Sequence, residues 1–296
     1  MPVPLYRDFL DQAQLDRDYD VEASVPDFSA YRRRFDAASL EALASLQPRR
    51  RIPYGPTRAE YFDLYLAKAP DAPVLIFFHG GYWRMLSSED FAFAAAGAAA
   101  NGITVANVNY ALCPGVSIGE IVRQARAAVA WIHRNGATLG LDTRHLHVGG
   151  HSAGAHLAAM CLLAEWHEDY DLPADMLQGG ILVGGLYDLS PLPYTFIQPQ
   201  LQLDWGMVRR NSPLLLARPM PQAKLLVAYG GRETGEFQRQ SRDFATAWTQ
   251  AGNSPPSLLV QSEEDHFSSA LALSDPASSL SNAIRALIHA APRRDG

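Results

Sequence analysis

Short runs of apolar residues alternate with longer stretches of helical periodicity along most of the chain. Runs typical of β-strands cover residues 74–78, 103–109, 146–149, 180–184, 224–229 and 257–261. Between the second and third run, apolar residues recur at i, i+3, i+4 and i+7 through residues 118–132, which is typical of a helix with one buried face. Strands that alternate with helices predict βαβ units and hence a parallel sheet.

The remaining patterns extend this sheet and cover it. Further helices are predicted to begin at Ala153, to cover residues 237–248 and 277–289, and to include an alanine-rich helix near residues 92–100. Residues 53–66 alternate in a way that suits an antiparallel hairpin at the edge of the sheet. The sequence therefore predicts an α/β fold with helices on both faces of the sheet.

Two segments lie outside this pattern. Residues 1–50 are polar with scattered aromatic side chains, and residues 186–222 are rich in proline and lie between two predicted strands. We expect both segments to form a small cap on a single domain that spans residues 1–296.

Composition narrows the classes of protein that fit. The 296 residues are 48% hydrophobic and 19% charged, which excludes a disordered chain. The net charge of −6, with no basic block longer than an arginine triplet, argues against a nucleic-acid partner. The chain has only two cysteines, Cys113 and Cys161, and shows neither a leader peptide nor a membrane-spanning stretch. We expect a cytoplasmic protein with no membrane partner.

A candidate nucleophile lies between a strand and a helix. The residues Gly150-His151-Ser152-Ala153-Gly154 form the pattern G-x-S-x-G in the strand–turn–helix context that gives it meaning. On so sharp a turn the backbone is strained, and side chains two residues before and after the serine would collide, so both positions need glycine. This pattern predicts that Ser152 is a catalytic nucleophile.

A second glycine pair follows the strand at residues 74–78. The segment continues as His79-Gly80-Gly81-Tyr82-Trp83. Acyl transfer creates a negatively charged oxygen, and glycines let backbone N–H groups approach it without obstruction. We therefore predict that Gly80, Gly81 and the N–H of Ala153 form an oxyanion hole.

A catalytic triad also needs an acid and a histidine after the serine, each just beyond a strand. Glu233 follows the strand predicted at 224–229, and His266 follows the strand at 257–261. Glu236 competes as the acid, although it lies in the opening turn of the next helix, where it would favour the helix dipole. Three further acids lie too close to His266 in sequence to orient its far nitrogen: Glu263, Glu264 and Asp265. We prefer Glu233.

Four histidines near the serine raise the alternative of a metal site. They crowd into twelve residues as His145, His147, His151 and His156. No carboxylate or cysteine completes a recognisable ligand set, so we expect no metal. His147 is expected to be a packed sheet residue, whereas His151 and His156 flank the serine and are expected to shape the pocket.

Together these motifs resemble the arylformamidase (kynurenine formamidase) branch of the α/β-hydrolase superfamily, near the hormone-sensitive-lipase-like esterases. Tyr82-Trp83 after the glycine pair is the most specific part of the resemblance, which also includes residues 54–56, 185–189, 211–213 and 236–241. The resemblance implies eight mostly parallel strands, a short cap, and a cofactor-free serine hydrolase that cleaves N-formyl aryl amides such as N-formylkynurenine. Glu233 departs from the aspartate of many relatives, and Arg84 from their neutral polar residue.

Three functions remain open at this point. The first is a formamidase, the second is a general carboxylesterase on small aryl or acyl esters, and the third is a non-catalytic ligand-binding protein on the same fold. We expect a small-molecule substrate, and the sequence permits a homodimer. The residues expected to line the substrate pocket are Tyr82, Trp83, His151 and Tyr187, with Tyr194 and Phe196 as further aromatic candidates.

Overall fold

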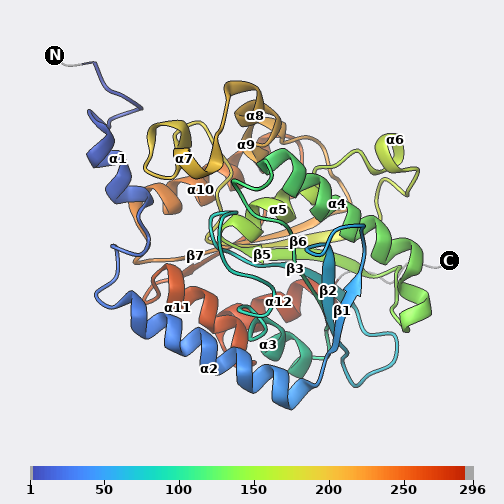
Figure 1. Ribbon diagram of the computed structural model, residues 1–296. Coiled ribbons are helices and arrows are strands. Elements are labelled where there is room, and N and C mark those ends of the chain that lie inside the picture. The colour runs from blue at the N-terminus through green and yellow to red at the C-terminus, as the bar shows by residue number, and fades with distance from the viewer. Residues whose placement is uncertain (1–2, 291–296) are drawn as a thin grey trace.

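Eight strands form one twisted sheet in the computed structural model, which describes residues 3–290 (Figure 1). The spatial order is β1-β2-β4-β3-β5-β6-β7-β8. The pairs β1–β2 and β2–β4 are antiparallel, and all other neighbouring strands are parallel. The strands are β1 (Arg49–Pro53), β2 (Tyr61–Tyr65), β3 (Val74–Phe78), β4 (Thr104–Val108), β5 (Leu146–His151), β6 (Leu177–Val183), β7 (Lys224–Gly230) and β8 (Ser257–Gln261). The predicted α/β fold is confirmed.

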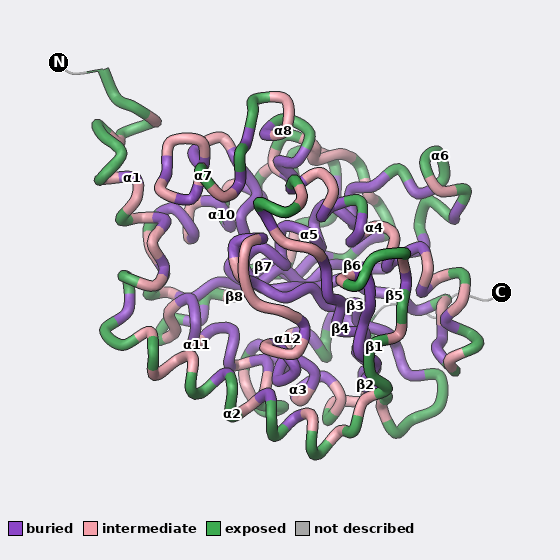
Figure 2. The backbone as a smooth tube through the Cα atoms, in the orientation of Figure 1, coloured by how far each residue is buried: buried purple, intermediate pink, exposed green. Residues whose placement is uncertain are grey.

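Helices cover both faces of this sheet. One face carries α4 (Ile118–Asn135), α5 (Ala153–Leu162) and α10 (Gly235–Gln250), and the other carries α3 (Ala94–Ala100) and α12 (Ser279–His289) (Figure 1). Since water reaches neither face, the central strands can be apolar throughout, and all five residues of β3 are buried. Figure 2 shows this buried centre as a continuous purple layer.

The first edge strand begins earlier than the hairpin predicted at residues 53–66. It begins at Arg49, within a run of three arginines that reads as a polar loop. Arg50 Nε donates a hydrogen bond of 3.0 Å to Asp63 Oδ2 on β2, and the Asp63 side chain has no solvent exposure. This ion pair lets a charged strand join the sheet edge.

The N-terminal segment, residues 3–48, is more ordered than its polar composition indicates. It contains α1 (Gln12–Tyr19) and the long α2 (Phe28–Leu46), which contacts α3 and α11 (His266–Leu271). Aromatic side chains at Phe28, Tyr31 and Phe35 repeat at i, i+3 and i+7 and face the body of the protein. The segment therefore covers the end of the sheet where α11 begins.

Residues 186–222 lie over the face of the sheet that carries α4, α5 and α10. They form a short 3₁₀ turn (Leu192–Tyr194) followed by α7 (Gln198–Leu201), α8 (Trp205–Arg210) and α9 (Pro213–Leu216). Helix α8 contacts α4, and α9 contacts both α5 and α10 (Figure 1). The remaining short elements are α6 (Trp166–Tyr170) and 3₁₀ turns at Gly136–Leu139 and Ala272–Ser274.

Two further observations bear on the expected environment. Cys113 and Cys161 are both buried and form no disulfide. None of the helices within residues 3–290 is long and apolar enough to cross a bilayer.

Candidate active site

Ser152 occupies a strained turn at the end of β5. Its backbone angles are φ 56° and ψ −121°, and α5 begins at the next residue. A Cβ atom on Gly154 would lie 1.9 Å from the carbonyl oxygen of Phe78, and one on Gly150 would lie 2.3 Å from the Gly154 carbonyl carbon. Both glycines are therefore required by close backbone contact, as the sequence pattern predicts, and the turn presents Ser152 beyond the sheet.

His266 and Glu233 meet at the same end of the sheet. His266 Nδ1 donates to Glu233 Oε2 at 2.9 Å, and Glu233 Oε1 accepts from the backbone N–H of Gly230 at 2.8 Å. Both side chains are almost fully buried. Because Nδ1 carries the proton toward the carboxylate, Nε2 is left with a lone pair on the opposite side of the ring.

The competing acids have other partners. Glu236 pairs with Arg239 at 2.6 Å and accepts a hydrogen bond from the Tyr19 hydroxyl. Asp265 caps the N-terminus of α11 through the N–H groups of Phe267 and Ser268. Glu233 is thus the acid that the structure brings to His266, in agreement with the sequence prediction. Glu263 forms an exposed ion pair with Arg232.

The loop after β3 has its peptide units held in fixed directions. The Tyr110 hydroxyl donates to the His79 carbonyl at 2.7 Å, and His79 Nδ1 donates to the Gly80 carbonyl at 2.7 Å. A planar peptide places its N–H opposite its carbonyl, so these two bonds also fix the directions of the Gly80 and Gly81 N–H groups. Burial lowers the pKa of His79 to about 4, which keeps the ring neutral. Gly80 and Gly81 can therefore serve as preorganised donors together with Ala153.

Two histidines beside the serine have structural partners. His151 Nε2 donates to the His266 backbone carbonyl at 2.9 Å, and the two rings lie with centroids 4.6 Å apart. The pKa of His151 lies well below its usual value. Burial is the larger cause, and the neighbouring His266 is the smaller one. His156 accepts from Trp83 Nε1 and donates to the Asn211 carbonyl, and burial lowers its pKa to about 4. Both rings are therefore neutral supports.

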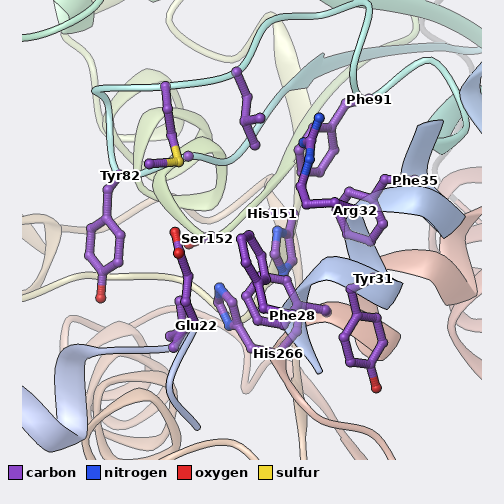
Figure 3. Close-up of a pocket in the computed structure, with 15 residues that line it drawn as sticks. Glu22, Phe28, Tyr31, Arg32, Phe35, Tyr82, Phe91, His151, Ser152 and His266 are labelled. Atoms are coloured by element: carbon purple, nitrogen blue, oxygen red, sulfur yellow. The ribbon is translucent and has the colours of Figure 1, made fainter. Parts of the chain in front are cut away.

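A cavity of about 350 Å³ opens at Ser152 and His266 (Figure 3). One wall comes from the body of the protein and includes His151, Gly81 and Tyr82. The other wall comes from the N-terminal segment. The aromatic and aliphatic residues that line the cavity as a whole are Val21, Phe28, Tyr31, Phe35, Tyr82, Met85, Leu86, Phe91 and Phe267. A flat aromatic group of modest size suits this lining.

Two predicted pocket residues do not line the cavity. Trp83 is completely buried, and its Nε1 donates to His156 on α5. Tyr187 is also completely buried, and its ring stacks on Phe244 at 4.6 Å. Contrary to the prediction from the sequence, neither Trp83 nor Tyr187 is among the residues that line this cavity. Tyr194 and Phe196 also lie outside the cavity lining.

The four histidines near Ser152 do not form one cluster of metal ligands in the described part of the chain. His145 and His147 lie near each other, with ring centroids 5.3 Å apart, while His151 and His156 contact other groups. Among residues 3–290, no group of three or more His, Cys, Asp and Glu side chains is arranged to hold an ion.

Sequence reasoning missed the contribution of the N-terminal segment to the pocket. Val21, Glu22, Phe28, Tyr31, Arg32 and Phe35 all line the cavity. The signal that could have revealed it is the i, i+3, i+7 aromatic repeat of α2, which predicts a helix with one buried face.

Comparisons with known proteins agree with this fold. The BD-FAE family model matches residues 62–178. Kynurenine formamidase of Danio rerio is 35% identical over 73% of this chain and 74% of its own length, and that of Salmo salar is 33% identical over 73% and 74%. Esterase LipQ of Mycobacterium tuberculosis is 27% identical over 68% of this chain and 52% of its own.

A solved structure from Silicibacter sp. TM1040, proposed to be a thioesterase, superposes with a TM-score of 0.81 at 28% identity, covering 93% of this chain and 99% of that one. The fold and these relatives define an α/β-hydrolase, and the protein is a hydrolase. More particularly, the chain belongs to the kynurenine formamidase family.

The contacts of the candidate acids predict a rank order of variants. Glu233→Gln should lower kcat by roughly 10⁴-fold, because an amide neither holds the correct imidazole tautomer nor balances its charge. Asp265→Asn should lower kcat by less than about tenfold, because asparagine caps a helix as well as aspartate does. Steady-state kinetics on an activated aryl ester measures both. A larger loss for Asp265→Asn or Glu236→Gln would place the acid elsewhere.

Burial of Trp83 predicts that it supports the loop and does not select substrates. Trp83→Phe removes the hydrogen bond to His156 and should lower the free energy of unfolding by about 1–3 kcal/mol. Its kcat/KM should fall by the same factor for an aryl and an aliphatic substrate. Denaturant unfolding and kinetics check this, with the exposed Trp205→Phe as control. A selective loss on the aryl substrate would show that Trp83 contacts the leaving group.

Proposed function

We propose that this hydrolase cleaves N-formyl aryl amides through an acyl-enzyme, with Ser152 as nucleophile, His266 as general base and acid, and Glu233 as the group that orients His266. The observation that carries the proposal is the convergence of the strained serine and the His266–Glu233 pair on one aromatic cavity. The family resemblance suggests N-formylkynurenine as the substrate.

The reaction follows from this geometry in two stages. His266 Nε2 accepts the Ser152 proton as Oγ attacks the formyl carbon, and the developing oxyanion receives hydrogen bonds from the N–H groups of Gly80, Gly81 and Ala153. His266 then gives the proton to the anilide nitrogen, so the C–N bond breaks and the aryl amine leaves. Water, activated by His266, hydrolyses the formyl-enzyme to formate and free serine.

The size and lining of the cavity favour an aryl leaving group with a small acyl group. About 350 Å³ accommodates one substituted aromatic ring, and four phenylalanines supply apolar contact. The formyl group adds a single hydrogen to the reacting carbon, so it needs little space beside Ser152. The volume and lining of the cavity thus support an N-formyl aryl amide as the substrate.

The second candidate function is a carboxylesterase on small aryl esters. The similarity to esterase LipQ favours it, and the proposed acyl-enzyme chemistry is the same. Phenolate is a far better leaving group than an anilide. A site that lacks specific recognition of the amide would therefore hydrolyse esters much faster.

The two functions are separated by one kinetic comparison. We expect kcat/KM for N-formylkynurenine to exceed that for phenyl acetate by about tenfold or more, which for the less reactive bond requires specific transition-state binding. N-acetylkynurenine serves as the control for the acyl group and should react slowly. Faster hydrolysis of phenyl acetate than of N-formylkynurenine would favour the carboxylesterase.

A further inference from the structure

The residue before the candidate nucleophile, His151, contacts the other parts of the site through its ring. Its Nε2 donates at 2.9 Å to the backbone carbonyl of His266, the proposed general base. The ring lies between those of His266 and Phe91, at centroid distances of 4.6 Å and 5.9 Å (Figure 3). A Cβ atom on Gly80 would lie 3.1 Å from His151 Nδ1. The same ring therefore also packs against the loop of the candidate oxyanion donors.

The hydrogen bond from His151 joins two separate segments of the chain. His151 is the last residue of β5, whereas His266 is the first residue of α11. A second side chain, Ser269, donates to the same carbonyl at 3.1 Å, but it belongs to α11 itself. Glu233 holds the His266 ring at Nδ1. His151 instead holds the backbone that carries this ring.

This bond requires one neutral form of the His151 ring. Because a carbonyl only accepts, Nε2 carries the proton and Nδ1 keeps a lone pair. Nδ1 is buried and has no hydrogen-bond partner within residues 3–290, so a proton on it would lack an acceptor. Burial, and to a lesser extent the neighbouring His266, holds the pKa of His151 well below its usual value. The ring therefore adds no positive charge beside His266, which becomes an imidazolium during the reaction.

We infer that His151 is a positioning residue, whose hydrogen bond fixes the backbone of His266 relative to Ser152, the residue that follows His151. The inference rests on the triad of the proposed function and adds a residue that acts through His266. A misplacement of about 1 Å between reacting groups costs on the order of 10²-fold in rate. Since every substrate depends on the same transfer of the Ser152 proton, loss of this hydrogen bond lowers kcat whatever the leaving group.

Three variants of His151 in the full-length protein test the inference by steady-state kinetics on phenyl acetate. His151→Phe keeps a planar ring but removes the donor, and it should lower kcat by about 10²-fold while KM changes by less than about threefold. His151→Gln carries an amide nitrogen that can donate to the same carbonyl, so kcat should stay within about tenfold of the unsubstituted protein. His151→Asn carries the same amide on a side chain one methylene shorter and should lose as much as His151→Phe.

His147→Gln is the matched control, because His147 is a buried histidine of the same strand that does not line the cavity. It should leave kcat within about twofold. Denaturant unfolding shows whether each variant folds, and the comparison of glutamine with asparagine decides the matter if His151→Phe does not. Normal kcat in His151→Phe, or equal losses in His151→Gln and His151→Asn, would overturn the inference. A loss confined to KM would overturn it too, because His151 would then bind substrate.

The use of an ester separates this inference from the proposed function. If phenyl acetate reacts and N-formylkynurenine does not, the formamidase proposal fails while the His151 variants still decide the role of this ring. If His266→Ala abolishes turnover of the ester and the His151 variants all keep normal kcat, only the inference about His151 fails. Normal turnover by His266→Ala would contradict the triad and the inference together.

Discussion

The close approach of α5 to the end of β3 is the constraint on which the rest of the site depends. Gly154 lies so near the Phe78 carbonyl that no side chain fits between them. This contact places the first turn of α5 against the strand whose continuation is the loop of Gly80 and Gly81. The serine and both groups of candidate oxyanion donors are therefore positioned by one backbone contact, and the strain at Ser152 is held by the sheet around it.

The N-terminal segment completes this arrangement from the other side. Three of its tyrosine hydroxyls donate to carboxylates of the body: Tyr6 to Asp188 at 2.9 Å, Tyr19 to Glu236 at 2.7 Å and Tyr31 to Asp265 at 2.5 Å. Hydrogen bonds to charged groups are among the stronger ones, at about 1.5–3 kcal/mol each. These bonds hold the N-terminal segment over the cavity. Two of the acceptors, Glu236 and Asp265, are acids that could otherwise compete with Glu233 for His266.

The sequence predicted those parts of the structure that local patterns determine. Buried parallel strands are continuous apolar runs, so the positions of β3 to β8 were expected within a few residues, and the glycine pair around Ser152 identified the turn. The pairing of His266 with Glu233 also agreed with expectation, because both follow neighbouring strands.

Features that depend on tertiary contacts escaped prediction. The arginines of β1 join the sheet only because Asp63 lies opposite Arg50, and α2 is recognised as a cover only when its aromatic repeat meets Phe267. Trp83 looked like a pocket wall because it follows the glycine pair. Its burial and its hydrogen bond to His156 depend on how the folded loop packs against α5.

The central claim is that Ser152 and His266 act as one unit. A double-mutant cycle tests it most directly, with kcat measured for the two single alanine variants and for the double variant. Each single change should lower kcat by roughly 10⁴- to 10⁶-fold, and the double change should cost little more, because neither residue catalyses without the other. Losses that multiply, or near-normal turnover by Ser152→Ala, would contradict the account.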